Sequence, residues 1–357
     1  MNGLNKKNTE QKKLKNNLAL HMNLPKSSNI LIITGLTILL GTTVIISLCV
    51  GRYPLSVNKL FSYIFTGQYS DESLPTVLLN VRLPRIIGAI VVGGALSVAG
   101  ASYQGLFRNP MVSPDILGVS SGAGFGASLA IMLSLPIIGI QITAFTFGLL
   151  AVFLALLVGR IVGKNHDKIL MLVLAGMVTG AIFNALISLM KYLADSDTKL
   201  PDITFWLMGS LAGIDMDELK VVVPVVLLGV VPLFLLGWRM NVLSFGEDEA
   251  RTLGINTTRL RIIIIACASL ITASVVCISG LIGWVGLIIP HFSRFLVGPD
   301  HKVMLPTAFL SGSIFMLIVD NVARSASSLE IPLGILISLI GAPLFLIFLA
   351  KSSKKSW

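Results

Sequence analysis

The stretch that decides the fold is "RLPRIIGAIVVGGALSVAG" (Arg82–Gly100), in which two arginines open a long apolar run rich in glycine. A run of this kind spans the hydrocarbon core of a bilayer as a helix, because about 20 residues cover roughly 30 Å. Small residues also let helix backbones approach closely in lipid. The stretch therefore predicts a tightly packed membrane helix that carries fixed positive charge at its start.

The whole chain has the composition of a membrane protein. Of its 357 residues, 54% are hydrophobic and 12% are charged, about half the charged share of soluble domains. The apolar runs are continuous, which favours helices over a β-barrel. We predict an all-α, polytopic membrane protein with ten transmembrane helices at about 30–50, 84–105, 115–135, 141–161, 169–192, 221–238, 262–280, 282–297, 304–322 and 332–350. Only "GLIGWVG" (Gly280–Gly286) separates the seventh segment from the eighth, so a broken or re-entrant pair is an alternative there.

Lysine and arginine set the orientation, because they accumulate on the cytoplasmic side of membrane proteins. With the N-terminus inside, the inner segments hold the larger share of these residues. We therefore expect both termini to be cytoplasmic, with basic tails at 1–29, expected to be flexible, and at 351–357. The net charge of +10 is spread over membrane-flanking segments, whereas nucleic-acid binding needs one basic face. We expect membrane lipid, and no nucleic acid, as a partner.

Residues for catalysis or metal binding are not evident. The three cysteines lie in predicted spans, and the four histidines form no ligand pair. The segment "GRIVGKN" (Gly159–Asn165) lacks the spacing and the final Ser or Thr of a phosphate loop. We predict no catalytic residue, no metal and no cofactor in this chain, so that ATP and Mg would be bound by another subunit. The polar residues of the glycine-rich segments either pack between helices or line a transport path: Ser102, Gln104, Ser120 and Ser121.

One inner connector has the pattern of a short helix. The segment "SFGEDEARTLGIN" (Ser244–Asn256) begins with three acidic residues and closes on Gly254. Acidic residues suit a helix N-terminus, and glycine suits the left-handed position after its C-terminus. The segment is either a plain surface connector or a rigid peg that a cytoplasmic partner holds.

Four long motifs resemble the iron-siderophore and cobalamin permease family of ABC importers, the FecCD type. They lie at Arg82–Gly124, at "MNVLSFGEDEARTLGI" (Met240–Ile255), at Gly280–Pro306 and at "PLGILISLIGAPLFLIFL" (Pro332–Leu349). The resemblance runs in order from about residue 30 to 350. It implies a ten-helix permease of the cell membrane that pairs as a homodimer or heterodimer, rests on two cytoplasmic ATPase subunits and receives its substrate from an extracellular or periplasmic binding protein.

The resemblance also implies roles for individual residues. Arg82, Arg85 and Arg324 would meet acidic residues of the binding protein; the alternatives are lipid phosphates or, for Arg324, an i,i+4 pair with Asp320. Coupling to the ATPase would fall on Glu249, Ala250, Leu253 and Gly254. The cytoplasmic gate would lie at Lys164, Asn165, His166, Asp167, Lys168, Ile169 and Leu170, where Lys168 departs from the family pattern.

The expected function is import of a metal chelate by alternating access, driven by the separate ATPase. Ferric siderophore is the first candidate substrate, followed by haem and cobalamin. The other class is a secondary transporter, which would usually carry paired ionisable residues at mid-membrane depth. Arg294 and Asp320 are the main charged residues within the predicted spans, and the sequence shows no evident partner at the same depth for either residue.

Overall fold

The structure is a computed structural model that describes residues 26–51, 62, 73–163, 168–327 and 329–352. The described residues form helices and connectors, without a β-strand. The helices are α2 (Lys26–Cys49), α4 (Ser73–Thr76), η1 (Val77–Arg82), α5 (Leu83–Phe107), η2 (Pro114–Leu117), α6 (Val119–Met132), α7 (Ile137–Val162), α8 (Lys168–Leu193), α9 (Lys199–Met208), α10 (Met216–Leu235), α11 (Gly237–Phe245), α12 (Glu247–Thr252), α13 (Thr257–Ser279), α14 (Val285–Val297), α15 (His301–Ser325) and α16 (Leu333–Ser352).

The all-helical membrane class predicted from the sequence is confirmed. Seven described helices are long and apolar enough to cross a membrane, and three shorter apolar helices accompany them. Each of the ten predicted segments overlaps one of these helices. Helix α14 has 13 residues, about 20 Å at 1.5 Å per residue, and Gly280–Trp284 separates it from α13. That ten segments cross the membrane stays a prediction.

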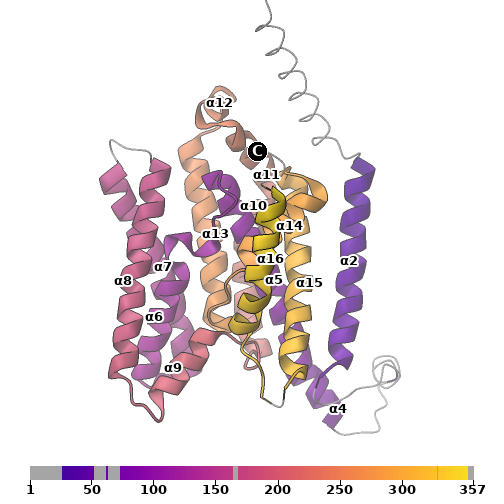
Figure 1. The fold of residues 1–357 in the computed structure, drawn as a ribbon, viewed down its shortest axis with the longest axis vertical. Helices are drawn as coiled ribbons and strands as arrows, with labels where there is room; N and C mark the ends of the chain where they lie inside the picture. The colour runs from indigo at the N-terminus through magenta and orange to yellow at the C-terminus, as the bar shows by residue number, and fades with distance from the viewer. Residues whose placement is uncertain (1–25, 52–61, 63–72, 164–167, 328, 353–357) are drawn as a thin grey trace, which may run out of the picture.

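The bundle has two ends that carry different elements (Figure 1). The "α12 end" carries α11, α12, the start of α2 and the C-terminal part of α16, and the "α9 end" carries α4, α9 and the connection between α15 and α16. The first and the last described residues of the chain, in α2 and α16, thus lie at the same end of the bundle. The side of the membrane that each end faces stays a prediction.

Helix α5 lies at the centre of the bundle. Most of its side chains are buried, and it packs against α10, α13, α14 and α15. The hydroxyl of Tyr103 lies 2.7 Å from that of Ser269, which joins α5 to α13 inside the core. Helices α6, α7 and α8 pack together beside this centre, and α2 packs on the outside of α15.

The central helix begins earlier than the predicted span at 84. Helices α4, η1 and α5 form one continuous helix of 35 residues from Ser73 to Phe107. Pro84 lacks a backbone N–H and its ring crowds the carbonyl one turn earlier. The π-helical turn η1 widens the backbone just before it, and the N–H of Leu83 bonds to the carbonyl oxygen of Leu78. The helix therefore continues through the proline.

Glycines set the distance between α5 and its neighbours, as the sequence predicted. A Cβ atom built on Gly93 would lie 2.3 Å from the carbonyl oxygen of Gly312 on α15, and one on Gly312 would lie 2.3 Å from that of Gly93. A Cβ atom on Gly100 would lie 1.8 Å from the carbonyl oxygen of Gly286 on α14. The backbones are in contact at both crossings, so no larger residue fits without separating the helices.

We predict that Gly93→Ala destabilises the bundle by about 1–3 kcal/mol, since the added methyl group must push α15 away. Gly41→Ala on α2 is the matched control, because a Cβ atom there meets nothing within 4 Å. Thermal unfolding of the purified variants in one detergent measures the effect. Equal melting temperatures for the two variants would contradict the close-packing account.

Candidate functional sites at the two ends of the bundle

The three arginines predicted to dock a partner gather in one cluster at the α9 end. Arg82 ends η1, Arg85 lies in the first turn of α5 and Arg324 in the last turn of α15. Their exposed fractions are 3%, 6% and 5%. The fold thus brings the three together, but it buries their side chains among groups of the same chain.

Arg85 is held between two carboxylates. Its Nε donates to both carboxylate oxygens of Asp320, at 2.9 and 3.1 Å, and its Nη1 donates to both oxygens of Glu330, at 3.0 and 2.9 Å. Asp320 is fully buried, whereas the Glu330 side chain is 29% exposed. The expectation that Asp320 has no partner at its depth is therefore wrong, because helix α5 brings Arg85 to it from far along the chain.

Arg324 and Arg82 contact the last turn of α2. Arg324 Nη2 donates to the carbonyl oxygen of Ser47 at 2.5 Å and to its hydroxyl at 3.0 Å, and it also bonds to Asn321. Arg82 donates to the carbonyl oxygen of Leu48. The last carbonyls of a helix have no partner within the helix, so the two guanidinium groups supply donors for them.

Arg324 also has the pairing with Asp320 that the sequence offered as an alternative. Its Nε lies 3.7 Å from the Asp320 carboxylate. Among the residues that the structure describes, two carboxylates, Asp320 and Glu330, lie in this cluster with the arginines, and Glu330 is the more accessible of the two.

The segment Ser244–Asn256 contains a short helix, as predicted. Helix α12 starts with Glu247, Asp248 and Glu249, and Gly254 takes the left-handed conformation, with φ +78°. Glu247 lies 3.6 Å from Arg251 within the helix and also pairs with Arg261 on α13. These ion pairs fasten α12 to the start of α13 at the α12 end (Figure 1).

The exposed face of α12 differs in one residue from the set predicted to contact an ATPase. Glu249, Gly254 and Leu253 are exposed, Leu253 by 63%. Ala250 has no exposed surface, so its side chain packs inside this chain and cannot face a partner. Phe245, at the end of α11, is 71% exposed beside α12. The sequence reading overlooked Phe245 because a single apolar residue in a connector carries no periodic signal.

The predicted cytoplasmic gate lies partly outside the described residues. Lys164, Asn165, His166 and Asp167 are not described, while Lys168, Ile169 and Leu170 begin α8. Leu170 is exposed. The gate stays a prediction.

Two of the polar residues considered for a transport path are packed inside the helical core. Ser102 is buried and bonds to the carbonyl oxygen of Val98. Gln104 donates to the carbonyls of Val112 and Leu287, each at 3.3 Å, and accepts from Arg294 at 3.3 Å. Arg294 thus also has a partner, contrary to the sequence reading, and packing accounts for Ser102 and Gln104.

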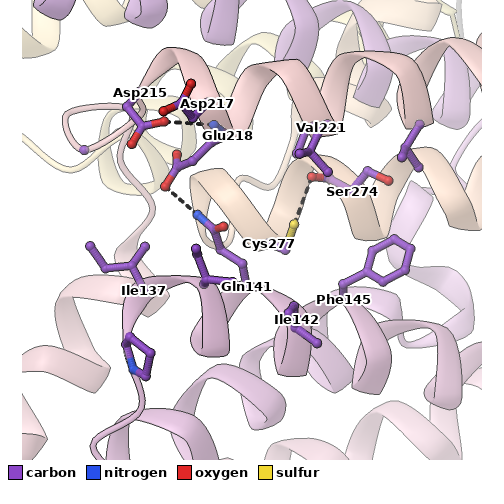
Figure 2. A pocket seen from close by; sticks show the side chains of 15 residues that line it. Ile137, Gln141, Ile142, Phe145, Asp215, Asp217, Glu218, Val221, Ser274 and Cys277 are labelled. Carbon is purple, nitrogen blue, oxygen red and sulfur yellow. Dashed lines mark hydrogen bonds between the residues drawn. The ribbon is translucent and has the colours of Figure 1, made fainter.

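A groove of about 970 Å³ lies near the α9 end between α7, α10 and α13 (Figure 2). Its walls are mainly apolar, and Glu218 accepts a hydrogen bond from Gln141 at 2.6 Å across it. Ile137, Ile142 and Val221 at its walls are each more than half exposed. Exposed apolar side chains on membrane helices suit contact with lipid or with another subunit, so we assign no functional site to the groove. Among the described residues no group of three His, Cys, Asp or Glu side chains can hold a metal ion.

These features define a class of protein: a polytopic helical membrane protein with a short, fastened helix at one end and a buried cluster of ion pairs at the other. The chain belongs to the FecCD transport family, whose sequence profile matches residues 38–351. Members are multi-pass permeases of ABC importers in the cell membrane, and they work with a separate ATPase subunit and a substrate-binding protein.

Individual relatives agree with this family. The chain is 45% identical to the molybdate import system permease protein MolB of Haemophilus influenzae, over 90% of this chain and 95% of that protein. It is 42% identical to the cobalamin import system permease protein BtuC of Halobacterium salinarum, over 78% and 74%. Among solved structures, a metal-chelate type ABC transporter in an inward-facing conformation matches with a TM-score of 0.81 and 45% identity, over 90% of this chain and 99% of that one.

We predict that Asp320→Asn destabilises the protein by about 3–5 kcal/mol, because the change leaves the buried guanidinium groups of Arg85 and Arg324 without their shared counter-charge. Asp217→Asn is the control, since Asp217 pairs with Lys220 at 2.6 Å on the exposed surface and such pairs contribute little. Thermal melting in lipid nanodiscs measures both. A melting temperature for Asp320→Asn as high as that of the control would show that the cluster does not hold the helices together.

Proposed function

We propose that this chain is the transmembrane subunit of a binding-protein-dependent ABC importer, with ten membrane crossings and both termini cytoplasmic. Two copies, or this chain and a related one, would form the path, and two ATPase subunits would contact the α12 end. The placement of the described termini and of α12 at one end supports this orientation (Figure 1). The observation that carries the proposal is α12, a short helix fixed by Glu247 and Arg261 that leaves Glu249, Leu253 and Gly254 exposed.

For the substrate we propose a metal chelate, with a ferric siderophore as the first candidate and haem or cobalamin behind it. The family, whose permeases serve chelates, supports this class. Molybdate is a second candidate, because the relative that shares 45% identity is named for it. Uptake of radiolabelled ferric siderophore and of radiolabelled molybdate into proteoliposomes, each with its own binding protein, decides between the two.

We expect Leu253→Asn to weaken the association with the ATPase by about 1–2 kcal/mol, since Leu253 is 63% exposed in this chain and burying a leucine side chain in a contact contributes up to about 1.5–3 kcal/mol. Leu329→Asn is the control, because Leu329 is 80% exposed in the connection between α15 and α16, at the α9 end. Co-purification and ATP hydrolysis by the complex are the measurements, and the chain alone should hydrolyse no ATP. Hydrolysis by the isolated chain, or equal complex recovery for both variants, would contradict the proposal.

We further propose that the α9 end receives the binding protein and that Arg85 meets one of its carboxylates. Arg85 already binds Glu330, whose side chain is the more exposed of its two acidic partners. An incoming carboxylate would therefore take the place of Glu330 and leave the pair with Asp320 intact. Arg82 and Arg324 lie in the same cluster and would add to its attraction for an acidic partner.

This arrangement predicts that Glu330→Gln tightens docking of the binding protein, because the variant removes the competing charge and leaves Arg85 in place. A gain of about 1 kcal/mol, or about fivefold in Kd, is expected. Arg85→Gln should instead weaken docking by about 2–5 kcal/mol. Lys220→Gln, at an exposed ion pair in the first turns of α10, is the control. Surface plasmon resonance with the cognate binding protein measures all three.

The two outcomes separate the two parts of this idea. Unchanged affinity in Glu330→Gln together with a loss in Arg85→Gln would reject competition but keep docking at the arginines. Unchanged affinity in both variants would reject docking at Arg85.

A further inference from the structure

Two small grooves adjoin at the α12 end, where α11 meets the start of α13. One has a volume of about 380 Å³ and includes Trp238 and Arg239, and the other has a volume of about 550 Å³ and includes Ile262. Both are lined by Arg259 and Ile263. Because they share these walls, the two grooves are together called the α11–α13 groove, which has cationic and apolar walls.

The two arginines of this groove have no acidic partner in the part of the chain that the structure describes. Arg239 and Arg259 are both exposed, and neither forms an ion pair. The acids of α12 do not pair with these arginines: Glu247 pairs with Arg251 and Arg261, Asp248 lies 4.0 Å from Arg251, and Glu249 is exposed without an ion pair to the described part of the chain. The groove therefore carries two positive charges that an anion can neutralise.

Its position along the helices indicates that it lies at a membrane surface. Helix α10 exposes Leu228, Val231 and Leu235 on its way to the α12 end, and Trp238 follows directly on α11, 49% exposed. Exposed aliphatic side chains mark the hydrocarbon region, and tryptophan gathers at the level of the lipid headgroups. Ile262 continues the apolar surface on α13 and is 58% exposed. Arg239 and Arg259 thus lie where headgroup phosphates are found.

We propose that the α11–α13 groove binds one anionic phospholipid. The guanidinium groups of Arg239 and Arg259 hold the phosphate, for which planar guanidinium donors are well suited. An acyl chain lies along Ile262 and Ile263, and the Trp238 ring packs at the headgroup. An acidic segment of a protein partner would match the two charges, but it would leave the aliphatic surface that runs toward the membrane unexplained.

The site lies beside α12, the helix proposed above to contact the ATPase. Leu253 and Gly254 line the same groove as Trp238 and Arg239. A lipid bound there therefore touches the base of α12 and links the membrane surface to it. The proposal depends only on the membrane location of the chain, so it stands or falls separately from the proposed function.

Native mass spectrometry of the full-length chain tests the proposal. The protein is released from nanodiscs that contain equal amounts of palmitoyl-oleoyl phosphatidylglycerol and palmitoyl-oleoyl phosphatidylcholine, and the retained lipid is identified. We expect a preference for phosphatidylglycerol that falls about fivefold for each arginine removed, and hence about 25-fold in Arg239→Gln/Arg259→Gln, since one basic residue near an anionic surface contributes about 1 kcal/mol.

Arg160→Gln is the matched control, because Arg160 is an exposed arginine in the last turn of α7 and lies outside the groove. Helix α7 starts beside the start of α10, so its last turn lies at the α12 end as well. The lipid preference of Arg160→Gln should stay within about twofold of that of the parent protein. The melting temperature of the double variant in phosphatidylcholine should match that of the parent, and this measurement separates lost binding from lost folding.

Four results would overturn the proposal. The double variant could retain the parent's preference, or the control could lose it to the same extent. Excess inorganic phosphate could displace the lipid completely, which would make the groove a free-anion site. Co-purification with the ATPase is measured as well, and a double variant that loses the ATPase while keeping the lipid would make the groove a protein contact.

Discussion

Direct backbone contact between α5 and its neighbours is the constraint on which the rest of this bundle depends. Lipid offers no hydrophobic driving force between helices, so close packing has to hold them. At Gly93 and Gly312 each backbone occupies the space that a side chain on the other would need, and the same holds where Gly100 meets Gly286. These crossings fix α15 and α14 against the central helix, and they thereby fix what lies at the ends of these helices.

The arginine cluster at the α9 end is one consequence of that placement. Because α15 crosses α5 closely, Asp320 comes within 2.9 Å of Arg85, and Arg324 reaches the end of α2. Burying a charge is costly unless it is paired and hydrogen-bonded. This chain satisfies the requirement internally through Asp320, Glu330 and the carbonyls of α2. Any partner that binds these arginines therefore competes with groups already present, and Glu330 is the one whose side chain water reaches most easily.

The α12 end differs from the arginine cluster, because it leaves charged and apolar side chains exposed. Its acidic helix is fastened by Glu247, while Leu253, Trp238, Arg239 and Arg259 remain exposed. A contact surface needs a fixed position, because a rigid element can transmit the motion of a partner to the helices. It also needs exposed side chains without partners, because these can bind. The apolar residues beside the arginines and the exposed aliphatic face of α10 fit the proposed place of this surface at the boundary between lipid and water.

The sequence by itself determined the helical membrane class, the positions of the apolar helices and the conformation of the segment around Gly254, because these follow from local composition, periodicity and capping. It also singled out Arg82, Arg85, Arg324 and the stretch around Glu249, through motifs that need no structure to be recognised. It could not show that Arg85 pairs with Asp320, that Gln104 meets Arg294, or that Ala250 is buried. The first two contacts join residues from different helices and are decided by the packing of α5 against α14 and α15. The burial of Ala250 depends on which side of α12 faces the bundle, and the packing of α12 against α11 and α13 decides it.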